Sequence, residues 1–237
     1  MIDFKYPRQL LLDLNLGYSQ TFENFIVGGN STLCSVLKKM HPFEYGYDYS
    51  VCCWSPASSG KSHLMRAYCA YWQEQGVMVN YLSGGNLLLD NLKLDSNQLS
   101  VIVFDDIHIY LGDKQKEEEL LYLLINCYER DIPFVCSSNS HPSKMSFALD
   151  DLATRFSAFY SFKLEHLQDM ELHNFIQTEG HRLGLTLGKE QIDIIIDKHP
   201  TDMHTIVSLM KELSQQINQG ELITGQDIER ASAILCH

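Results

Sequence analysis

The fold is decided by one loop, whose sequence is Trp54-Ser55-Pro56-Ala57-Ser58-Ser59-Gly60-Lys61-Ser62-His63, and by the segments on either side of it. A short apolar strand precedes the loop and a helical pattern follows it, which is the context that phosphate-binding loops require. In such a loop, main-chain N–H groups and the helix N-terminus surround phosphate oxygens. The sequence departs from GxxxxGK[ST] at its first position, where Ser55 stands for glycine, and Ser58 replaces a glycine that many such loops carry.

The polar residues of this loop have predictable tasks. We expect the Lys61 ammonium to reach the terminal phosphates of a nucleotide and the Ser62 hydroxyl to ligate Mg²⁺. The other predicted nucleotide contacts within the loop are Ser55, Ser58, Ser59, Gly60 and His63. A Gly-Lys-Ser tripeptide arises by chance in about one of ten chains of this length, so the surrounding sequence has to decide.

The segment Val101-Ile102-Val103-Phe104-Asp105-Asp106 supplies that context, because it is a buried strand that ends in two carboxylates. At a strand tip beside the phosphate loop, Asp105 is expected to hold Mg²⁺ through water and Asp106 to orient an attacking water. The alternative is that the two residues only end a strand and cap a turn. The order and spacing of the two segments favour a nucleotide site.

Strands and helices alternate through the first two thirds of the chain. The apolar patterns predict strands over 49–54, 77–82, 101–104, 134–137 and 159–164, and helices over 63–75 and 115–130. From about Gln168 only helical patterns follow, and the fourth helix of this C-terminal region is expected to begin at Thr224. We therefore expect an α/β parallel sheet flanked by helices and followed by a small all-α domain. Glu117-Glu118-Glu119 is interpreted as a solvated helix face.

Three polar residues farther along the chain are candidates for nucleotide sensing. Asn139 follows a predicted strand, where P-loop ATPases with a helical lid place a sensor of the γ-phosphate, although an ordinary turn explains it equally well. Arg155 precedes the last strand, and an exposed guanidinium there can neutralise charge on a neighbouring subunit's phosphoryl group. A surface ion pair with Asp150 or Asp151 is the alternative. His204 opens a helix and is either a lid cation over the nucleotide or a plain surface residue.

The N-terminal stretch Gln9-Leu10-Leu11-Leu12-Asp13-Leu14 is unusually rich in leucine. One interpretation is a core helix that packs on the body of the protein. The other is an extended peptide whose leucine side chains fill pockets on another protein, with Gln9 supplying an orienting hydrogen bond. The residues alone leave both interpretations open.

Composition restricts the compartment and the partners. Lys and Arg total 18 against 30 Asp and Glu, a formal net charge of −12, so we expect no direct specific binding to nucleic acid. The 7 cysteines lie mostly in apolar stretches, which indicates buried thiols of a reducing compartment. No apolar run approaches the roughly 18 residues that span a bilayer, and the first residues lack the pattern of a signal peptide. We therefore expect a cytoplasmic protein that makes no membrane contact.

The chain resembles the AAA+ replication regulators related to the bacterial initiator DnaA, over almost its whole length. Thr21-Phe22-Glu23-Asn24-Phe25-Ile26-Val27-Gly28-Gly29-Asn30 is similar to the family's TFxNFxxGxxN opening, and Asp105-Asp106 matches its Walker B ending. Asn139 falls at sensor 1, where the family carries Asp, and His204 falls at sensor 2, where it carries Arg. Arg155 falls on the box VII arginine finger, which implies a catalytic role for Arg155 in trans.

The resemblance also assigns a partner to the N-terminus. Gln9 to Leu14 resembles the QLxLxL hexapeptide through which such regulators dock on the DNA-loaded sliding clamp of DNA polymerase, which implies contacts from Gln9, Leu10, Leu12 and Leu14. The implied organisation is a clamp-binding segment over 1–18, an AAA+ nucleotide-binding α/β domain over 19–165 and a helical lid domain over 166–237.

The function that the resemblance implies is regulatory. The expected protein binds a nucleotide, ADP, together with Mg²⁺, contacts the initiator DnaA and stimulates its ATP hydrolysis; self-association as a homo-oligomer is compatible with it. It acts mainly by activating the ATPase of a partner, with at most weak NTPase activity of its own. Two other classes stay open: a free-standing P-loop ATPase or small-molecule kinase with Asp106 as base, and a DnaA-like loader that binds DNA directly.

Overall fold

Five parallel strands form the central sheet in a computed structural model that describes residues 20–39, 47–56, 59–83, 100–199, 203–216 and 223–235. Across the sheet the strands are β2 (Met78–Ser83), β3 (Ser100–Asp105), β4 (Phe134–Ser138), β1 (Val51–Trp54) and β5 (Tyr160–Lys163). Every residue of β3 and β4 is buried. Strands covered on both faces have apolar runs in place of alternation, which is why the sequence predicts them within a residue or two.

The register of the strands brings the predicted site residues to one edge of the sheet. Trp54 at the end of β1 pairs with Ser138 at the end of β4, and Phe104 of β3 pairs with Cys136. Because all pairs are parallel, the segments that follow β1, β3 and β4 leave the sheet at the same edge. This edge carries the phosphate-loop candidate, the two aspartates and Asn139.

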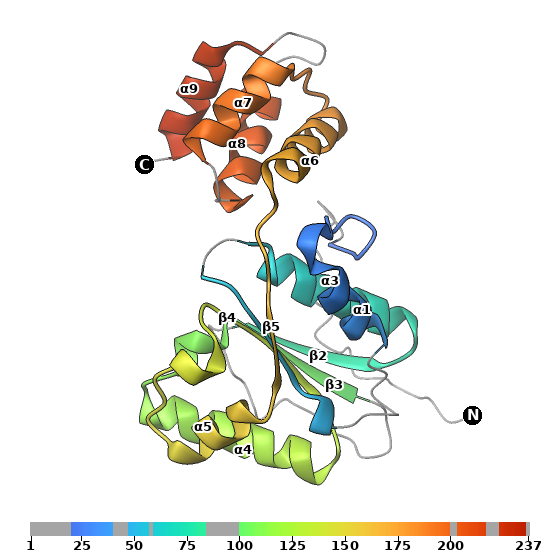
Figure 1. Ribbon diagram of the computed structural model, residues 1–237, viewed down its shortest axis with the longest axis vertical. Helices are drawn as coiled ribbons and strands as arrows, with labels where there is room; N and C mark the ends of the chain where they lie inside the picture. Colours follow the sequence, from blue (N-terminus) through green and yellow to red (C-terminus); the bar gives the residue numbers. More distant parts are fainter. Residues whose placement is uncertain are drawn as a thin grey trace, which may run out of the picture.

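Helices cover both faces of the sheet (Figure 1). One face carries α1 (Ser31–Lys39) and α3 (Lys61–Glu74), and the other carries α4 (Lys114–Glu129) and α5 (Asp150–Ser157). The adjacent residues Cys52 and Cys53 pack into different faces, as their alternation on a strand predicts. All six cysteines within the described ranges are buried and free.

Four helices follow the last strand and enclose a core of their own (Figure 1). They are α6 (Asp169–Arg182), α7 (Lys189–Lys198), α8 (Met203–Gln216) and α9 (Gly225–Leu235). The expected start of the last helix is confirmed, because the Asp227 carboxylate accepts hydrogen bonds from Thr224 N at 2.9 Å and Thr224 Oγ1 at 2.6 Å. No helix within the described ranges is long and apolar enough to cross a membrane.

One prediction about the helices is wrong. Glu117, interpreted from sequence as part of a solvated face, is fully buried. Its carboxylate accepts hydrogen bonds from the main-chain N–H groups of Gly112, Ala148 and Leu149 at 2.7 to 2.9 Å. Glu118, the next residue, is exposed as expected. The helices α1 and α5 were not predicted.

Candidate functional site

The phosphate-loop candidate ends in a sharp turn at the start of α3. Gly60 has φ of +90°, a conformation that side chains disfavour, and it precedes Lys61, the first residue of the helix. Lys61 is only 9% exposed, and its ammonium donates to the main-chain oxygen of Ser55 at 2.9 Å. Burial lowers the pKa of Lys61, and the nearby charges of Asp106 and Asp105 partly oppose this shift. The loop therefore encloses a cation beside the N-terminus of a helix, which is the arrangement that binds phosphate.

The serines of the loop differ in whether their side chains line the neighbouring cavity. Ser55 is fully buried and meets Lys61 through its main-chain oxygen, so its side chain is not among those that line the cavity described below. The buried hydroxyl of Ser59 lines that cavity and has no hydrogen-bond partner among the described residues. An unpartnered buried hydroxyl is costly, so this atom fits a ligand oxygen. Ser62 lines the cavity, and Ser58 lies outside the described residues.

The two aspartates at the end of β3 have different environments. Asp105 is buried, and its carboxylate accepts hydrogen bonds from the Tyr81 hydroxyl at 2.8 Å and from the Ser137 hydroxyl. Ser137 Oγ in turn accepts from the main-chain N–H of Asp106 at 2.8 Å. Asp105 is therefore a buried anchor behind the cavity, whereas Asp106 lines the cavity.

A positive φ of 55° at Asp106 turns the chain immediately after the strand. Burial and the charge of Asp105 raise the pKa of Asp106, while His108 and Lys61 oppose the rise. His108 also lines the cavity, with Nδ1 at 4.0 Å from Asp106 Oδ1, and burial lowers its pKa. A carboxylate that lines a cavity together with a lysine can orient water or a hydroxyl.

A cavity of about 920 Å³ joins these residues to the helical region. Its size lies in the range of small-molecule sites, which is about 300–1,000 Å³. The predicted site residues on its wall are Ser59, Gly60, Lys61, Ser62, His63, Asp106, Asn139 and His204. The structure thus brings together residues that lie as much as 145 positions apart, from Ser59 to His204.

The helical region contributes one face of α8 to this cavity. His204, Val207, Ser208 and Lys211 line it at helical spacing, and both His204 and Lys211 are exposed. On α6, Arg182 lines the cavity and pairs with Glu179, its Nε donating to Glu179 Oε2 at 2.8 Å. Arg182 and Lys211 were not predicted from the sequence, although Lys211 lies two helical turns after His204 and therefore shares its helix face.

His63 fastens the segment before α1 to the start of α3. Its Nε2 lies 2.9 Å from Asn24 Oδ1 and 3.3 Å from the main-chain oxygen of Thr21. Asn24 Oδ1 also accepts from Thr21 N at 2.9 Å. Burial lowers the pKa of His63, which favours the neutral ring in this position. Asn24 and Phe25 of the TFxNF segment line the cavity.

Arg155 lies away from this cavity. It is partly buried on α5, its Cζ lies 6.0 Å from the centroid of the Tyr128 ring, and it is not among the residues that line the cavity. Among the described residues, neither Asp150 nor Asp151 forms an ion pair with it. The alternative of a surface ion pair with these two aspartates therefore finds no support.

Residues 16–162 match the family described as the bacterial DnaA ATPase domain. The chain belongs to this family. Domain III of the replication initiation protein DnaA from Thermotoga maritima is similar in structure, with a TM-score of 0.74 and 21% identity over 90% of this chain and 95% of that one. AMPPCP-bound DnaA from Aquifex aeolicus has a TM-score of 0.71 and 21% identity over 93% of this chain and 71% of that one.

The same fold extends to a motor protein. The RuvB Holliday junction branch migration motor of Thermotoga maritima has a TM-score of 0.67 and 17% identity over 91% of this chain and 72% of that one. These likenesses confirm the predicted fold class, a parallel AAA+ sheet flanked by helices and followed by a helical region. In this member of the DnaA ATPase family, Gln9, Leu10, Leu12 and Leu14 lie outside the described residues.

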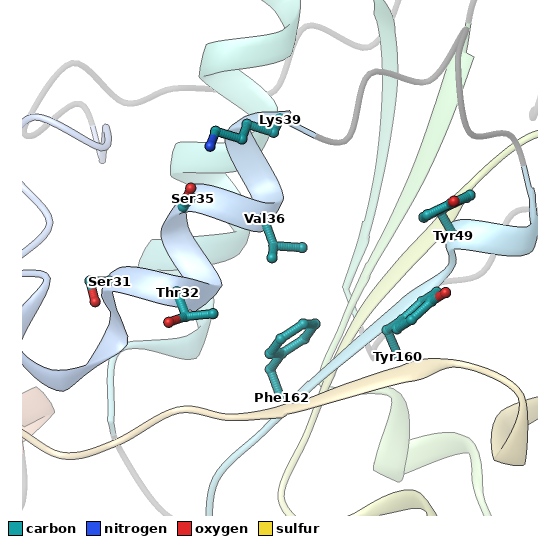
Figure 2. Close-up of a pocket in the computed structure, with 8 residues that line it drawn as sticks. All are labelled: Ser31, Thr32, Ser35, Val36, Lys39, Tyr49, Tyr160 and Phe162. Carbon is teal, nitrogen blue, oxygen red and sulfur yellow. The ribbon is translucent and has the colours of Figure 1, made fainter.

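A second hollow, of about 780 Å³, lies between α1 and the edge strand β5 (Figure 2). Val36 and Phe162 point toward each other across this hollow. The rings of Tyr49 and Tyr160 are stacked, with their centroids 5.6 Å apart. Its polar groups are hydroxyls and the Lys39 ammonium, and none of the predicted site residues lies on its wall. Of these two cavities, the first is therefore the one that holds predicted site residues.

Proposed function

We propose that this DnaA-family chain is a cytoplasmic, clamp-tethered regulator of bacterial replication initiation, of the Hda type. In this function it binds a nucleotide, docks on the DNA-loaded sliding clamp and stimulates ATP hydrolysis by the initiator DnaA. The chain's own nucleotide cavity and its arginine finger then serve different molecules. The net charge of −12 suits a protein that reaches DNA-bound machinery through protein contacts.

The position of Arg155 is the observation that carries this proposal. A guanidinium that lies outside its own chain's cavity, with neither neighbouring aspartate paired to it, is suited to act on another subunit. Arginine fingers supplied in trans stabilise the charge that develops on a transferred phosphoryl group, and they contribute about 10³–10⁵ in rate where they operate. The implied contact is head to tail, because Arg155 and the cavity are different surfaces of one chain.

The proposed cofactor of the cavity is ADP with Mg²⁺. The turn at Gly60, the Lys61 ammonium and the unpartnered Ser59 hydroxyl fit the phosphates, and Ser62 is the protein ligand expected for Mg²⁺. Mg²⁺ neutralises phosphate charge when it is bound. Asp105, Asn139 and His204 would support the nucleotide, with Asp105 acting from behind the cavity.

The finger is tested by replacing Arg155. An Arg155→Ala protein should retain nucleotide and clamp binding but lose stimulation of ATP hydrolysis by DnaA. Arg155→Lys should recover only a small part, since a lysine lacks the planar fork of donors. Arg230→Ala is the matched control, because Arg230 is an exposed arginine of α9 that is remote from α5 in sequence. Stimulation at the wild-type rate by Arg155→Ala would refute the proposal.

The tether is tested separately at the N-terminus. Gln9→Ala combined with Leu12→Ala should abolish retention on immobilised sliding clamp while leaving the melting temperature unchanged. Leu11→Ala is the control, because position 11 is not a contact position in QLxLxL. Loss of the fold in the double variant, or equal retention by all three proteins, would return this segment to the interpretation as a core helix.

A free-standing ATPase is the second candidate, and the placement of Asp106 and Lys61 on the wall of one cavity favours it. In this alternative, Asp106 orients water for hydrolysis of the chain's own nucleotide. Steady ATP turnover by the isolated chain, abolished by Asp106→Asn, would support it. ATP turnover that appears only when DnaA is added to the chain supports the proposed function as a regulator.

A further inference from the structure

The guanidinium of Arg155 lies against an aromatic ring that belongs to a different helix. Arg155 Cζ is 6.0 Å from the centroid of Tyr128, the penultimate residue of α4. Tyr128 is 60% exposed, so its ring meets the arginine at the protein surface. A cation over a ring face is attracted by the ring's quadrupole. Tyr128 therefore restricts where this long and flexible side chain can point.

A second tyrosine holds Tyr128 in place. The Tyr47 ring is nearly buried and meets the Tyr128 ring edge to face, with centroids 5.5 Å apart. The Tyr47 ring also packs edge to face on the Phe159 ring, with ring centroids 6.1 Å apart. Burial raises the pKa of Tyr47, and the neighbouring Arg155 guanidinium partly opposes the rise. The surface ring beneath the arginine is thus supported from the core.

The other end of α4 fixes the helix that carries the arginine. The Glu117 carboxylate accepts hydrogen bonds from Leu149 N at 2.8 Å and from Ala148 N at 2.9 Å. Leu149 is the N-cap residue of α5, the helix that carries Arg155. The two helices lie side by side (Figure 1). One helix therefore anchors both the start of α5 and the tip of the Arg155 side chain.

We propose that Tyr128 is a positioning residue that presets the Arg155 guanidinium for a phosphoryl group bound to a partner subunit, an inference that rests on the proposed function of Arg155 as a finger in trans. A free arginine side chain loses rotamer freedom when it is fixed in a catalytic complex. Presetting moves that loss into folding, so the benefit appears in the rate of hydrolysis within the assembled complex. Tyr128 therefore acts on the maximal rate and leaves the affinity of docking unchanged.

The experiment uses the full chain with DnaA and clamp-loaded DNA. Tyr128→Ala removes the ring, Tyr128→Leu keeps apolar bulk on Tyr47 without a π face, and Tyr128→Phe keeps the ring. Tyr122→Ala is the matched control, because Tyr122 is a 67% exposed tyrosine of the same helix that forms no cation–ring pair with Arg155 in the described structure. The readouts are the maximal rate of ATP hydrolysis by DnaA and the regulator concentration that gives half of it.

A positioning role predicts a distinctive pattern. Tyr128→Ala and Tyr128→Leu should lower the maximal rate by about threefold to tenfold with the half-maximal concentration unchanged, while Tyr128→Phe and Tyr122→Ala stay within about twofold of wild type. A raised half-maximal concentration at an unchanged maximal rate would make Tyr128 a docking contact and overturn the inference. Equal losses in Tyr128→Ala and Tyr122→Ala, or full stimulation by Tyr128→Leu, would overturn it as well.

A second measurement separates this inference from the proposed function. If Arg155→Ala stimulates DnaA normally, the proposed function fails whatever Tyr128 does. The Nε–Hε NMR signal of Arg155, assigned by its loss in Arg155→Ala, reports the ring directly in the isolated chain. It should move in Tyr128→Ala through loss of the ring current and stay in place in Tyr122→Ala. An unmoved signal in Tyr128→Ala would refute the contact itself.

Discussion

Removing the buried carboxylate of Glu117 should destabilise the protein more than any exposed substitution on α4. Glu117→Ala leaves three main-chain N–H groups without their acceptor: those of Gly112, Ala148 and Leu149, now held at 2.7 to 2.9 Å. These groups belong to the loop after η4 (Ile107–Tyr110) and to the N-terminus of α5. The substitution thus removes hydrogen bonds that hold two segments beside the proposed functional surfaces.

The size of the effect follows from the number of orphaned donors. A fully buried donor left unpaired costs about 1–3 kcal/mol, and the hydrogen bonds of these three donors are partly buried. Water admitted to the vacated space satisfies part of this demand, so we expect a loss near the lower limit for three donors, about 3 kcal/mol in the free energy of unfolding. For a chain of this size, that loss corresponds to a melting temperature lower by about 6–12 °C. Glu117→Gln should fall between wild type and Glu117→Ala, because its NH₂ group faces donors.

Urea unfolding followed by circular dichroism measures the difference, with Glu118→Ala as the matched control. Glu118 is exposed, and its one ion pair within the described ranges is an i,i+4 pair with Lys114 at 4.0 Å, so its removal should cost no more than about 0.5 kcal/mol. If Glu117→Ala is no less stable than Glu118→Ala, the hydrogen bonds to Glu117 neither stabilise the fold nor anchor α5.

Three further predictions concern the cavity and its walls. Lys61→Ala should abolish binding of a fluorescent ADP analogue with the fold retained; undiminished binding would remove the cavity as the nucleotide site. Burial lowers the pKa of His63 below its ordinary value of about 6.5, so its contribution to stability is fully present above that pH and is lost as pH falls through the lowered pKa. Between pH 7.5 and pH 5.5, the free energy of chemical unfolding should therefore fall less for His63→Gln than for wild type. Identical falls in the two proteins would contradict the lowered pKa of His63. Asn30→Ala should cost about 2 kcal/mol in urea unfolding, because Asn30 accepts from Glu165 N at 2.7 Å and donates to Glu165 O at 3.0 Å; a loss below about 0.5 kcal/mol would show that this link is weak.

The parts of the fold that sequence predicted are those with strong local patterns. The runs at β3 and β4 are apolar because both faces of the sheet are covered, and each leads directly into polar site residues. Thr224 and Asp227 predict the start of α9 because the two residues that form this cap lie within one helical turn. α5 was missed because it is only 8 residues long and contributes few residues to the core.

The residues that sequence analysis interpreted wrongly or missed depend on distant partners. Glu117 resembles its exposed neighbours, and its burial follows from N–H groups that lie 31 and 32 positions later in the chain. Tyr81 reaches Asp105 from the neighbouring strand β2, a contact that no local pattern signals. Position in a motif identified Asp105 and Asp106 together, but only the structure separates the buried anchor from the residue that lines the cavity.

This chain is proposed to activate the ATPase of DnaA when it is tethered to the clamp. The most direct measurement follows phosphate release from ATP-bound DnaA, with the chain added in the presence and absence of clamp-loaded DNA. Release should be accelerated only when chain and loaded clamp are both present, and Arg155→Ala should not accelerate it. Equal release with and without the chain on clamp-loaded DNA would contradict the claim.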